Sequence, residues 1–178
     1  MDDLDRLAPL RAQFYLQRYE EVLRLYAQLA SASVGPSLTL ELAAYGRRAQ
    51  IALAFETRGP QSAPITIPHP HLSALFDVYE AYWRAESQQA AHETDALATK
   101  AVSLLQAESA EVPNGEMALA ASLVAIVLMR CQRFEEAARI VHPYIESSPE
   151  AYDLVSFPIR PQTHSSTGRP CSCKSTWR

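Results

Sequence analysis

Apolar side chains recur at intervals of three and four residues along most of this chain, which is the spacing of one face of an α-helix. The pattern is strongest between Met117 and Pro149, where a segment that is apolar on nearly every side precedes an amphipathic segment that begins at Phe134. We interpret the two segments as a buried helix and a second helix that covers it. Pro149 is expected to end the pair.

The same spacing predicts further helices over residues 4–16, 20–31, 37–57, 71–87 and 88–108. Residues 58–70 contain one glycine and four prolines, so they are predicted to form a loop, with Ile65 to Ile67 as a short extended piece. The sequence lacks the strict alternation of apolar and polar residues that marks a half-buried strand. The predicted fold class is therefore all-α.

Two positions predict interruptions of this helical pattern. Residues 113–115, with the sequence Pro-Asn-Gly, are typical of a turn and should separate the helix at 88–108 from the buried helix. Pro143 falls inside the helix that begins at Phe134. Because proline lacks an N–H group and its ring collides with the preceding turn, we expect Pro143 to kink or end this helix near Val141.

The large and small residues of the last helix pair resemble the tetratricopeptide repeat, a helix-turn-helix unit of about 34 residues. Ala125 and Ala137 fall at the small positions where its two helices cross, Phe134 at the aromatic of the turn, and Pro149 at the terminal proline. Gln132 stands where the repeat has a turn glycine. The segment Gln17–Val22 repeats the pattern of Gln132–Ala137, which indicates more than one such unit.

This resemblance implies an α-solenoid of antiparallel helix hairpins, stacked as a right-handed superhelix over residues 1–155. The length of 178 residues, with 48% hydrophobic and 20% charged residues, suits one globular domain. All acidic residues lie at or before Asp153, so the predicted array offers no phosphate-binding face and nucleic acid is not an expected partner. Residues 156–178 are rich in Ser, Thr, Pro and Arg and are predicted to form a disordered basic tail.

The cysteines and the longest apolar run bear on location. The chain has three cysteines, Cys131, Cys171 and Cys173, and an odd number without an apolar leader predicts a reducing, cytoplasmic location. The apolar run that starts at Met117 ends at Arg130, which is shorter than the roughly 20 residues that a spanning helix needs. We therefore interpret it as a core helix.

Residue types that could carry chemistry have simpler structural explanations, so no catalytic, cofactor-binding or metal-binding residue is predicted. Proline flanks both histidines of one candidate pair, adjacent carboxylates on a helix point about 100° apart, and a thiol at the end of an apolar helix is typical of inert packing. The sets considered are His69 with His71, His164 with Cys171 and Cys173, Glu20 with Glu21, Glu135 with Glu136, and Cys131 alone.

A polypeptide-binding surface does have candidates. In tetratricopeptide stacks the first helix of each hairpin lines a concave groove, and this mapping assigns to the groove five residues: Leu119, Ser122, Ile126, Met129 and Arg130. The lining is mostly apolar, which favours a helix or strand of a partner over a charged peptide end. The alternative is that these residues pack against neighbouring helices.

Residues 1 to about 155 as a whole resemble the epsilon subunit of the coatomer, the COPI vesicle coat. The resemblance lies in Leu10–Leu23, in Arg47–Leu53 and in the helix pair around Phe134. It implies a non-enzymatic coat subunit that binds the C-terminal domain of the alpha coatomer subunit in Golgi-to-ER and intra-Golgi transport. Such a protein is cytoplasmic, lies at Golgi membranes and COPI vesicles, and associates with membranes only through the coat.

Two other functions remain open at this point. One is a general tetratricopeptide scaffold with another client. The other is a small helical enzyme or cofactor binder that uses the aromatic residues Tyr79, Tyr82 and Trp83. The loop at 58–70 and the short length of the array are departures from the coatomer pattern.

Overall fold

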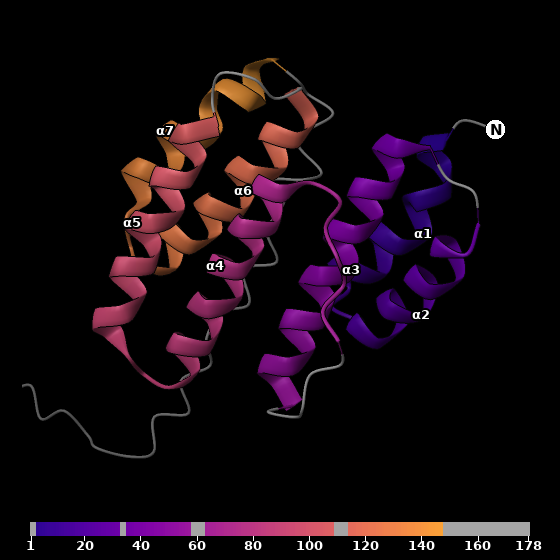
Figure 1. Cartoon of the computed structure of the whole chain (residues 1–178), viewed down its shortest axis with the longest axis horizontal. Helices are drawn as coiled ribbons and strands as arrows, with labels where there is room; N and C mark the ends of the chain where they lie inside the picture. Colours follow the sequence, from indigo (N-terminus) through magenta and orange to yellow (C-terminus); the bar gives the residue numbers. More distant parts are fainter. Residues whose placement is uncertain (1–2, 33–34, 58–62, 109–113, 148–178) are drawn as a thin grey trace, which may run out of the picture.

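The computed structural model describes residues 3–32, 35–57, 63–108 and 114–147 (Figure 1). Within these ranges the chain forms seven α-helices and no strand, which confirms the all-α class and is consistent with an α-solenoid. The predicted tail at 156–178 lies outside the described residues. The helices are α1 (Asp3–Tyr15), α2 (Tyr19–Ala30), α3 (Pro36–Thr57), α4 (Pro70–Ser87), α5 (Ala91–Glu108), α6 (Asn114–Arg130) and α7 (Phe134–Ser147).

The structure confirms the break between α5 and α6 but assigns Asn114 and Gly115 to α6, and it shows that α7 does not end near Val141. Asn114 and Gly115 belong to the first turn of α6, where backbone N–H groups have no intrahelical partner and residues of low helix propensity are tolerated. Pro143 lies within α7, which continues to Ser147. Arg139 and Pro143 both lie on the exposed side of α7, so water can replace the hydrogen bond that the proline cannot donate.

Three helix hairpins are closed by the same kind of turn. Gln17, Gln89 and Gln132 follow α1, α4 and α6, and all three have positive φ, at 58°, 58° and 61°. In the last turn the N–H of Gln132 donates to the carbonyl of Met129 at 3.0 Å, and the N–H of Arg133 donates to that of Leu128 at 2.9 Å. This pair of bonds is a Schellman motif, and the turns at Gln17 and Gln89 have the same pair.

Four helices, α1, α3, α4 and α6, lie side by side and run in the same direction (Figure 1). Between α1 and α3, Arg11 pairs with Glu41 at 2.6 Å, and the rings of Phe14 and Tyr45 meet at 5.1 Å. The later residue of α1 contacts the later residue of α3, so the two helices are parallel.

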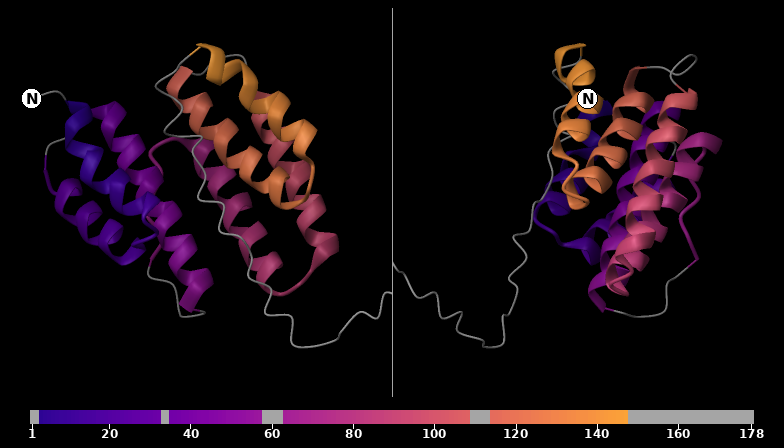
Figure 2. Two further views of the ribbon diagram at one scale, coloured as in Figure 1. Left: turned by 180° about the vertical axis from the view of Figure 1, so that it is seen from behind. Right: turned by 90° about the vertical axis from the view of Figure 1, so that its left-hand side faces the viewer.

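The same direction holds across the rest of this layer. Arg47 of α3 forms an ion pair with Glu80 of α4, and further along the rings of Phe55 and Trp83 meet at 5.0 Å. The guanidinium of Arg130, at the end of α6, lies over the ring of Trp83. The antiparallel helices pack against this row, α2 on α1 and α3, α5 on α4 and α6, and α7 on α6 (Figure 2).

The core is divided into two clusters that meet at α3. One lies among α1, α2 and α3, and the other runs from α3 through α7. Leu42 and Tyr45 of α3 belong to the first cluster, whereas Ala43 and Ala44 belong to the second. Opposite faces of α3 therefore serve different cores, which explains why residues 42–49 are buried without interruption.

Helix α3 has no hairpin partner of its own among the described residues. Its neighbour in the chain is the segment 63–69, which forms neither helix nor strand. The backbone N–H of Ile65 donates to the side chain of Gln50 at 2.9 Å, and Ile67 is buried in the larger cluster. The extended piece expected at Ile65 to Ile67 is thus packed along α3 without pairing in a sheet.

Gly46 allows two elements to approach α3 closely. A Cβ atom built at this position would lie 2.8 Å from the ring of Tyr26 on α2 and 2.9 Å from the side chain of Ile65. Both distances are shorter than ordinary carbon contacts. The close approach of α2 and of the segment 63–69 to α3 therefore requires a glycine at position 46.

The apolar helix α6 remains a core element. Every residue from Met117 to Leu128 is buried. None of the helices described here is long and apolar enough to cross a membrane.

Candidate functional site

The predicted groove lining is mostly buried. Leu119, Ser122 and Ile126 are only 3%, 0% and 9% exposed, whereas Met129 and Arg130 at the end of α6 are half-buried. The expectation that the first three line an open groove is therefore wrong, and the alternative of packing against neighbouring helices holds for them. The physical reason is that α4 covers this face of α6.

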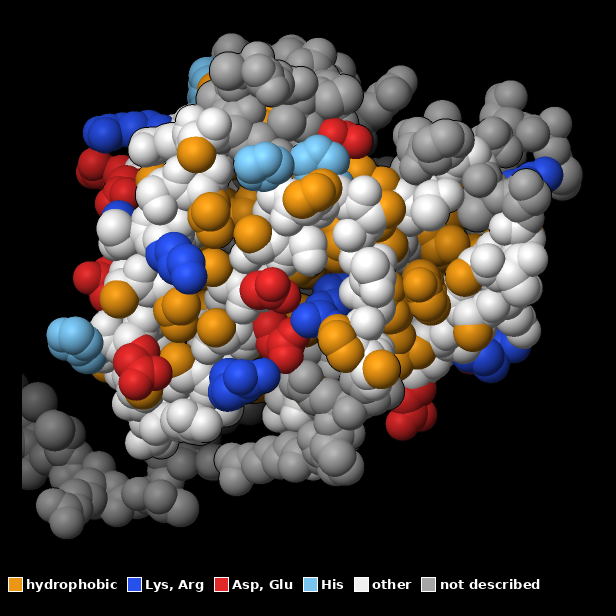
Figure 3. All heavy atoms as spheres, in the orientation of Figure 1, with side chains coloured by type: hydrophobic (Ala, Val, Ile, Leu, Met, Phe, Trp, Pro, Cys, Tyr) orange, Lys and Arg blue, Asp and Glu red, His pale blue; other side chains and the backbone are white. Residues whose placement is uncertain are grey.

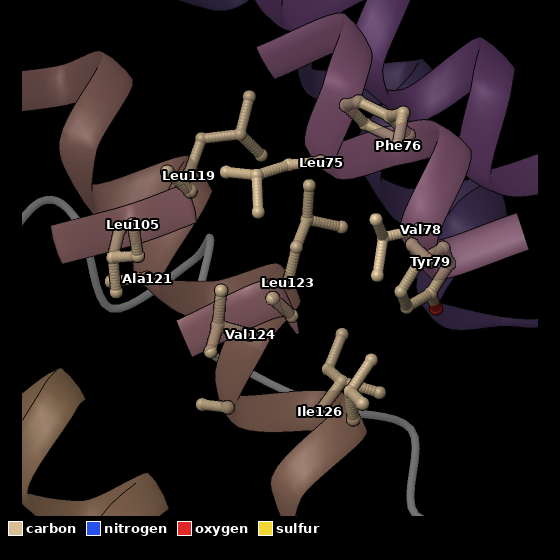
Figure 4. Packing of buried hydrophobic residues seen from close by; sticks show 14 of the residues in the cluster. Leu75, Phe76, Val78, Tyr79, Leu105, Leu119, Ala121, Leu123, Val124 and Ile126 are labelled. Atoms are coloured by element: carbon tan, nitrogen blue, oxygen red, sulfur yellow. The ribbon is translucent and has the colours of Figure 1, made fainter. Parts of the chain in front are cut away.

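The close view of the core shows how the two helices meet. Leu119 lies beside Leu75, and Ile126 lies toward Val78 and Tyr79 of α4 (Figure 4). Ser122 donates a hydrogen bond to the carbonyl of its own helix at Leu119, at 2.7 Å. Its hydroxyl is thereby satisfied inside the core and offers nothing to a partner.

Arg130 is the predicted site residue that reaches a partly exposed cluster. Its guanidinium carbon lies 4.6 Å from the centre of the Trp83 ring, which is a cation–π arrangement. Its Nε lies 3.7 Å from a carboxylate oxygen of Glu86. Phe55 at the end of α3 meets the edge of the same indole at 5.0 Å. We call these four residues, Phe55, Trp83, Glu86 and Arg130, the Trp83 patch.

The Trp83 patch is built from the C-terminal ends of three helices of the parallel layer, α3, α4 and α6. The side chains of Arg130 and Glu86 are 30% and 22% exposed, and Phe55 is 37% exposed. An aromatic side chain and a guanidinium group are therefore both open to solvent in one place. Aromatic residues and arginine are enriched at protein interfaces relative to the rest of the surface.

Two buried polar atoms in the patch have no hydrogen-bond partner: the indole nitrogen of Trp83 and one carboxylate oxygen of Glu86. Burial raises the pKa of Glu86 above its usual value of 4.5, and the nearby Arg130 offsets only part of this shift. The carboxylate is thus poorly solvated, which makes the patch a place where electrostatic interactions are stronger than in water.

A second cluster of charged side chains joins α3 to α4 and has a structural role. Arg47 is buried and pairs with Glu80, which also pairs with Arg84 at 3.0 Å, and Asp77 lies 3.9 Å from Arg47. Figure 3 shows acidic and basic side chains adjoining one another in the centre of this face. Because these charges neutralise each other, they serve the contact between α3 and α4.

The residues that carry the coatomer resemblance are mostly packing residues. Phe14 and Val22 are in the smaller core, and the buried guanidinium of Arg48 stacks on the Phe14 ring at 4.6 Å. Burial raises the pKa of the Tyr45 hydroxyl strongly, helped by its contact with Tyr15. These residues explain how α1, α2 and α3 hold together.

His69, one of the histidines considered as metal ligands, caps the N-terminus of α4. His69 accepts a hydrogen bond through Nδ1 from the N–H of Leu72 at 3.4 Å, and its Nε2 lies 3.7 Å from Glu116. The ring centres of His69 and His71 are 6.0 Å apart. No group of three or more His, Cys, Asp or Glu within the described ranges could hold a metal ion. His164, Cys171 and Cys173 lie outside these ranges.

The remaining candidates for chemistry are also part of the packing. Tyr79 and Tyr82 lie inside the larger core, where they meet Trp83 edge to face. The thiol of Cys131 is half-buried and lies 3.8 Å from the carbonyl of Thr94, and burial raises its pKa. A thiol with a raised pKa is a weak nucleophile at neutral pH.

Sequence reasoning identified Arg130 but missed the role of Phe55 and Glu86. Phe55 has the spacing of an inward-facing residue, and only its place beyond the cover of neighbouring helices exposes it. Comparison of the chain with models of known protein families, with curated proteins and with solved structures gave no match.

Proposed function

We propose that this protein is a non-enzymatic interaction module that holds a segment of another polypeptide against the layer formed by α1, α3, α4 and α6. The observation that carries the proposal is the Trp83 patch. It brings an exposed aromatic ring and a partly exposed guanidinium together at the ends of three adjacent helices.

The finer architecture that we propose is a tetratricopeptide-like, right-handed superhelical stack. The repeated Schellman turns at Gln17, Gln89 and Gln132 and the parallel direction of α4 and α6 support it. The intervals between these turns are longer than the repeat's usual length of about 34 residues. Segment 63–69, which takes the place of a hairpin partner for α3, is a further departure from a regular array.

A photo-crosslinking experiment tests the interaction function. Phe55 is replaced by a benzophenone-bearing amino acid, and the full chain is irradiated in a cell extract. We expect a discrete crosslinked protein that is absent when the same amino acid replaces Leu16, which is equally apolar and 60% exposed at the α1–α2 turn. Equal crosslinking from both positions, or none from position 55, would contradict the proposal.

The narrower form of the proposal names the partner as the C-terminal domain of the alpha coatomer subunit. It is supported by the resemblance of Leu10–Leu23 and Arg47–Leu53 to the epsilon subunit, and it places the protein in the cytoplasm at Golgi membranes and COPI vesicles. It involves no cofactor and no nucleic acid. The general scaffold with another client is the alternative.

Affinity capture separates the two forms. The alpha subunit's C-terminal domain is immobilised and the full chain is passed over it, with an unrelated helical domain as the control bait. Selective retention is expected if the partner is the coatomer. Failure of retention, together with a crosslinked protein of another identity at position 55, would assign the patch to a different client.

A further inference from the structure

We propose that the Trp83 patch recognises an Asp or Glu side chain that neighbours a large apolar side chain in a segment of the partner. This inference rests on the proposed function and deepens it by naming the chemistry of the bound segment. The carboxylate would meet the edge of the Arg130 guanidinium, and the apolar side chain would pack on Phe55.

The geometry of Arg130 leaves its hydrogen-bonding capacity available. The central carbon of the guanidinium lies over the Trp83 ring, 4.6 Å from the ring centre, and this cation–π contact does not use the N–H groups as hydrogen-bond donors to an oxygen. Within the described residues the side chain of Arg130 donates no hydrogen bond, because the carboxylate oxygen of Glu86 with which it pairs is 3.7 Å from Nε. A planar guanidinium of this kind suits a carboxylate that binds through both oxygens.

Glu86 is a weak internal counter-ion. Its other carboxylate oxygen is buried without a donor, and burial raises the pKa of its carboxyl group. Arg130 and Glu86 are 3.7 Å apart, which is within ion-pair range but beyond hydrogen-bond distance, so the pair leaves the N–H donors of Arg130 unused. A carboxylate arriving from a partner can approach the solvent-exposed side of Arg130 and make hydrogen bonds that Glu86 does not make.

The apolar half of the site is Phe55. Its ring is more than one-third exposed and is held edge-on against Trp83, with an angle of 70° between the ring planes. An aromatic or large aliphatic side chain placed there would remove apolar surface from water. Phe55, Glu86 and Arg130 are each partly exposed near the ends of three adjacent helices, so a segment that passes over the patch can contact Phe55 and Arg130 together. We therefore assign the carboxylate to a side chain within a segment and not to a chain end.

Tryptophan fluorescence can test this directly, because the chain has only two tryptophans. Replacing Trp177 with Phe leaves Trp83 as the sole emitter. The probes are acetylated, amidated hexapeptides containing Phe-Asp, Phe-Asn or Ala-Asp in an alanine background, and an acetylated peptide that ends in Phe with a free carboxylate.

We expect the Phe-Asp peptide to give a saturable change in Trp83 emission below about 10 mM, in the range of a weak single-site contact. The Phe-Asn and Ala-Asp peptides should bind roughly tenfold more weakly or not at all, because each lacks one of the two contacts. Tighter binding of the peptide with the free end would reassign the carboxylate to a chain terminus and overturn the proposal, as would equal binding of Phe-Asp and Phe-Asn or the absence of saturation.

Variants of the same protein identify the residues. Arg130→Gln should weaken binding of the Phe-Asp peptide by roughly tenfold or more. Arg139→Gln, which removes a highly exposed arginine on α7, should leave the affinity for this peptide unchanged. Glu86→Gln should tighten binding severalfold, because it removes the competing carboxylate and keeps a similar shape. A purely structural role of the Arg130–Glu86 contact predicts weaker binding in both variants, and that result would overturn the proposal.

The outcomes for the inference and for the proposed function are distinguishable. If position 55 still crosslinks to a partner in the Arg130→Gln protein at the parent's level, the interaction function stands and the carboxylate specificity fails. If crosslinking and peptide binding are both absent in the parent, the interaction function itself fails.

Discussion

Gln132 has an unfavourable backbone conformation in a type of turn that occurs three times in this chain. Its φ of 61° lies in the left-handed region, which is unfavourable for residues with a Cβ atom. Gln17 and Gln89 share this conformation at the other two hairpins. The hydrogen bonds of the Schellman motif and the packing of the following helix hold all three in place.

Replacing Gln132 with Gly is therefore expected to stabilise the protein. Glycine adopts positive φ without the steric penalty, so the free energy of unfolding should rise by about 0.5–1 kcal/mol. Urea denaturation followed by circular dichroism measures the change. Gln106→Gly is the control, since Gln106 is an exposed residue within α5 and the same substitution there should destabilise. A loss of stability in the Gln132 variant would mean that its side chain has a role beyond the turn.

At the level of elements, α3 and α7 depart from the simple picture of stacked hairpins. Helix α3 joins two cores and is accompanied by segment 63–69 in place of a partner helix. Phe134, which the sequence predicts as a packing aromatic at the start of α7, is 60% exposed. The aromatic that the repeat pattern assigned to the turn therefore does not pack in the core: no described helix follows α7 to cover that face, and Ala137 and Val141 make the buried contact with α6 instead.

Helix α2 approaches α3 closely where α3 has Gly46. Gly46→Ala places a Cβ atom within 3 Å of Tyr26 and Ile65, so the free energy of unfolding should fall by about 1–3 kcal/mol. Thermal melts and urea titrations measure the loss. In Gly35→Ala, where nothing lies within 4 Å of the added Cβ, we expect a change of less than about 1 kcal/mol from altered helix capping alone. Similar effects in the two variants would show that α2 moves easily away from α3.

For the whole molecule, the contact between α3 and α4, called here the joint, determines whether helices α1–α3 and helices α4–α7 unfold together. Helix α3 contacts α4 less extensively than it contacts α2, and the chain between α3 and α4 is not a hairpin. The buried Arg47 and its partner Glu80 cross this joint. Since the Trp83 patch includes Phe55 from one side and Trp83 and Arg130 from the other, its shape depends on the same joint.

Arg47→Ala is expected to weaken this joint. The variant leaves Glu80 with only the exposed Arg84 as a partner, and we expect a loss of about 2 kcal/mol, less than for a fully buried pair because Glu80 keeps some solvent and one ion pair. Unfolding should also become less cooperative, which would appear as a weaker dependence of the free energy of unfolding on urea concentration.

The control for this joint is Arg24→Ala, which removes an exposed pair with Glu21 within α2 and should leave the transition unchanged. An Arg47 variant with parental stability and slope would show that apolar contacts alone join the two cores.

Helix positions were largely predictable because they depend on local periodicity, as the buried run of α6 and the amphipathic α7 illustrate. Turns were less predictable: Gln132 stands where the repeat has a turn glycine, but glutamine itself gives no signal of a left-handed conformation. Asn114 and Gly115 are turn residues in most contexts, yet they belong to α6. Of the candidate site, Arg130 was among the five residues that the repeat mapping assigned to the groove. Glu86 was not, because its significance comes from burial beside residues distant in sequence.

The sequence by itself determined that the chain is helical, where most helices lie and which of them is the most apolar, since these properties follow from neighbours within one or two turns. Only the tertiary structure decided which apolar faces are covered. The same spacing that marks Leu119 as a groove residue also suits a buried contact, and the position of α4 against α6 settles the difference. Exposure of Phe55 and the meeting of Trp83 with Arg130 likewise depend on how parallel helices are placed, which no local pattern encodes.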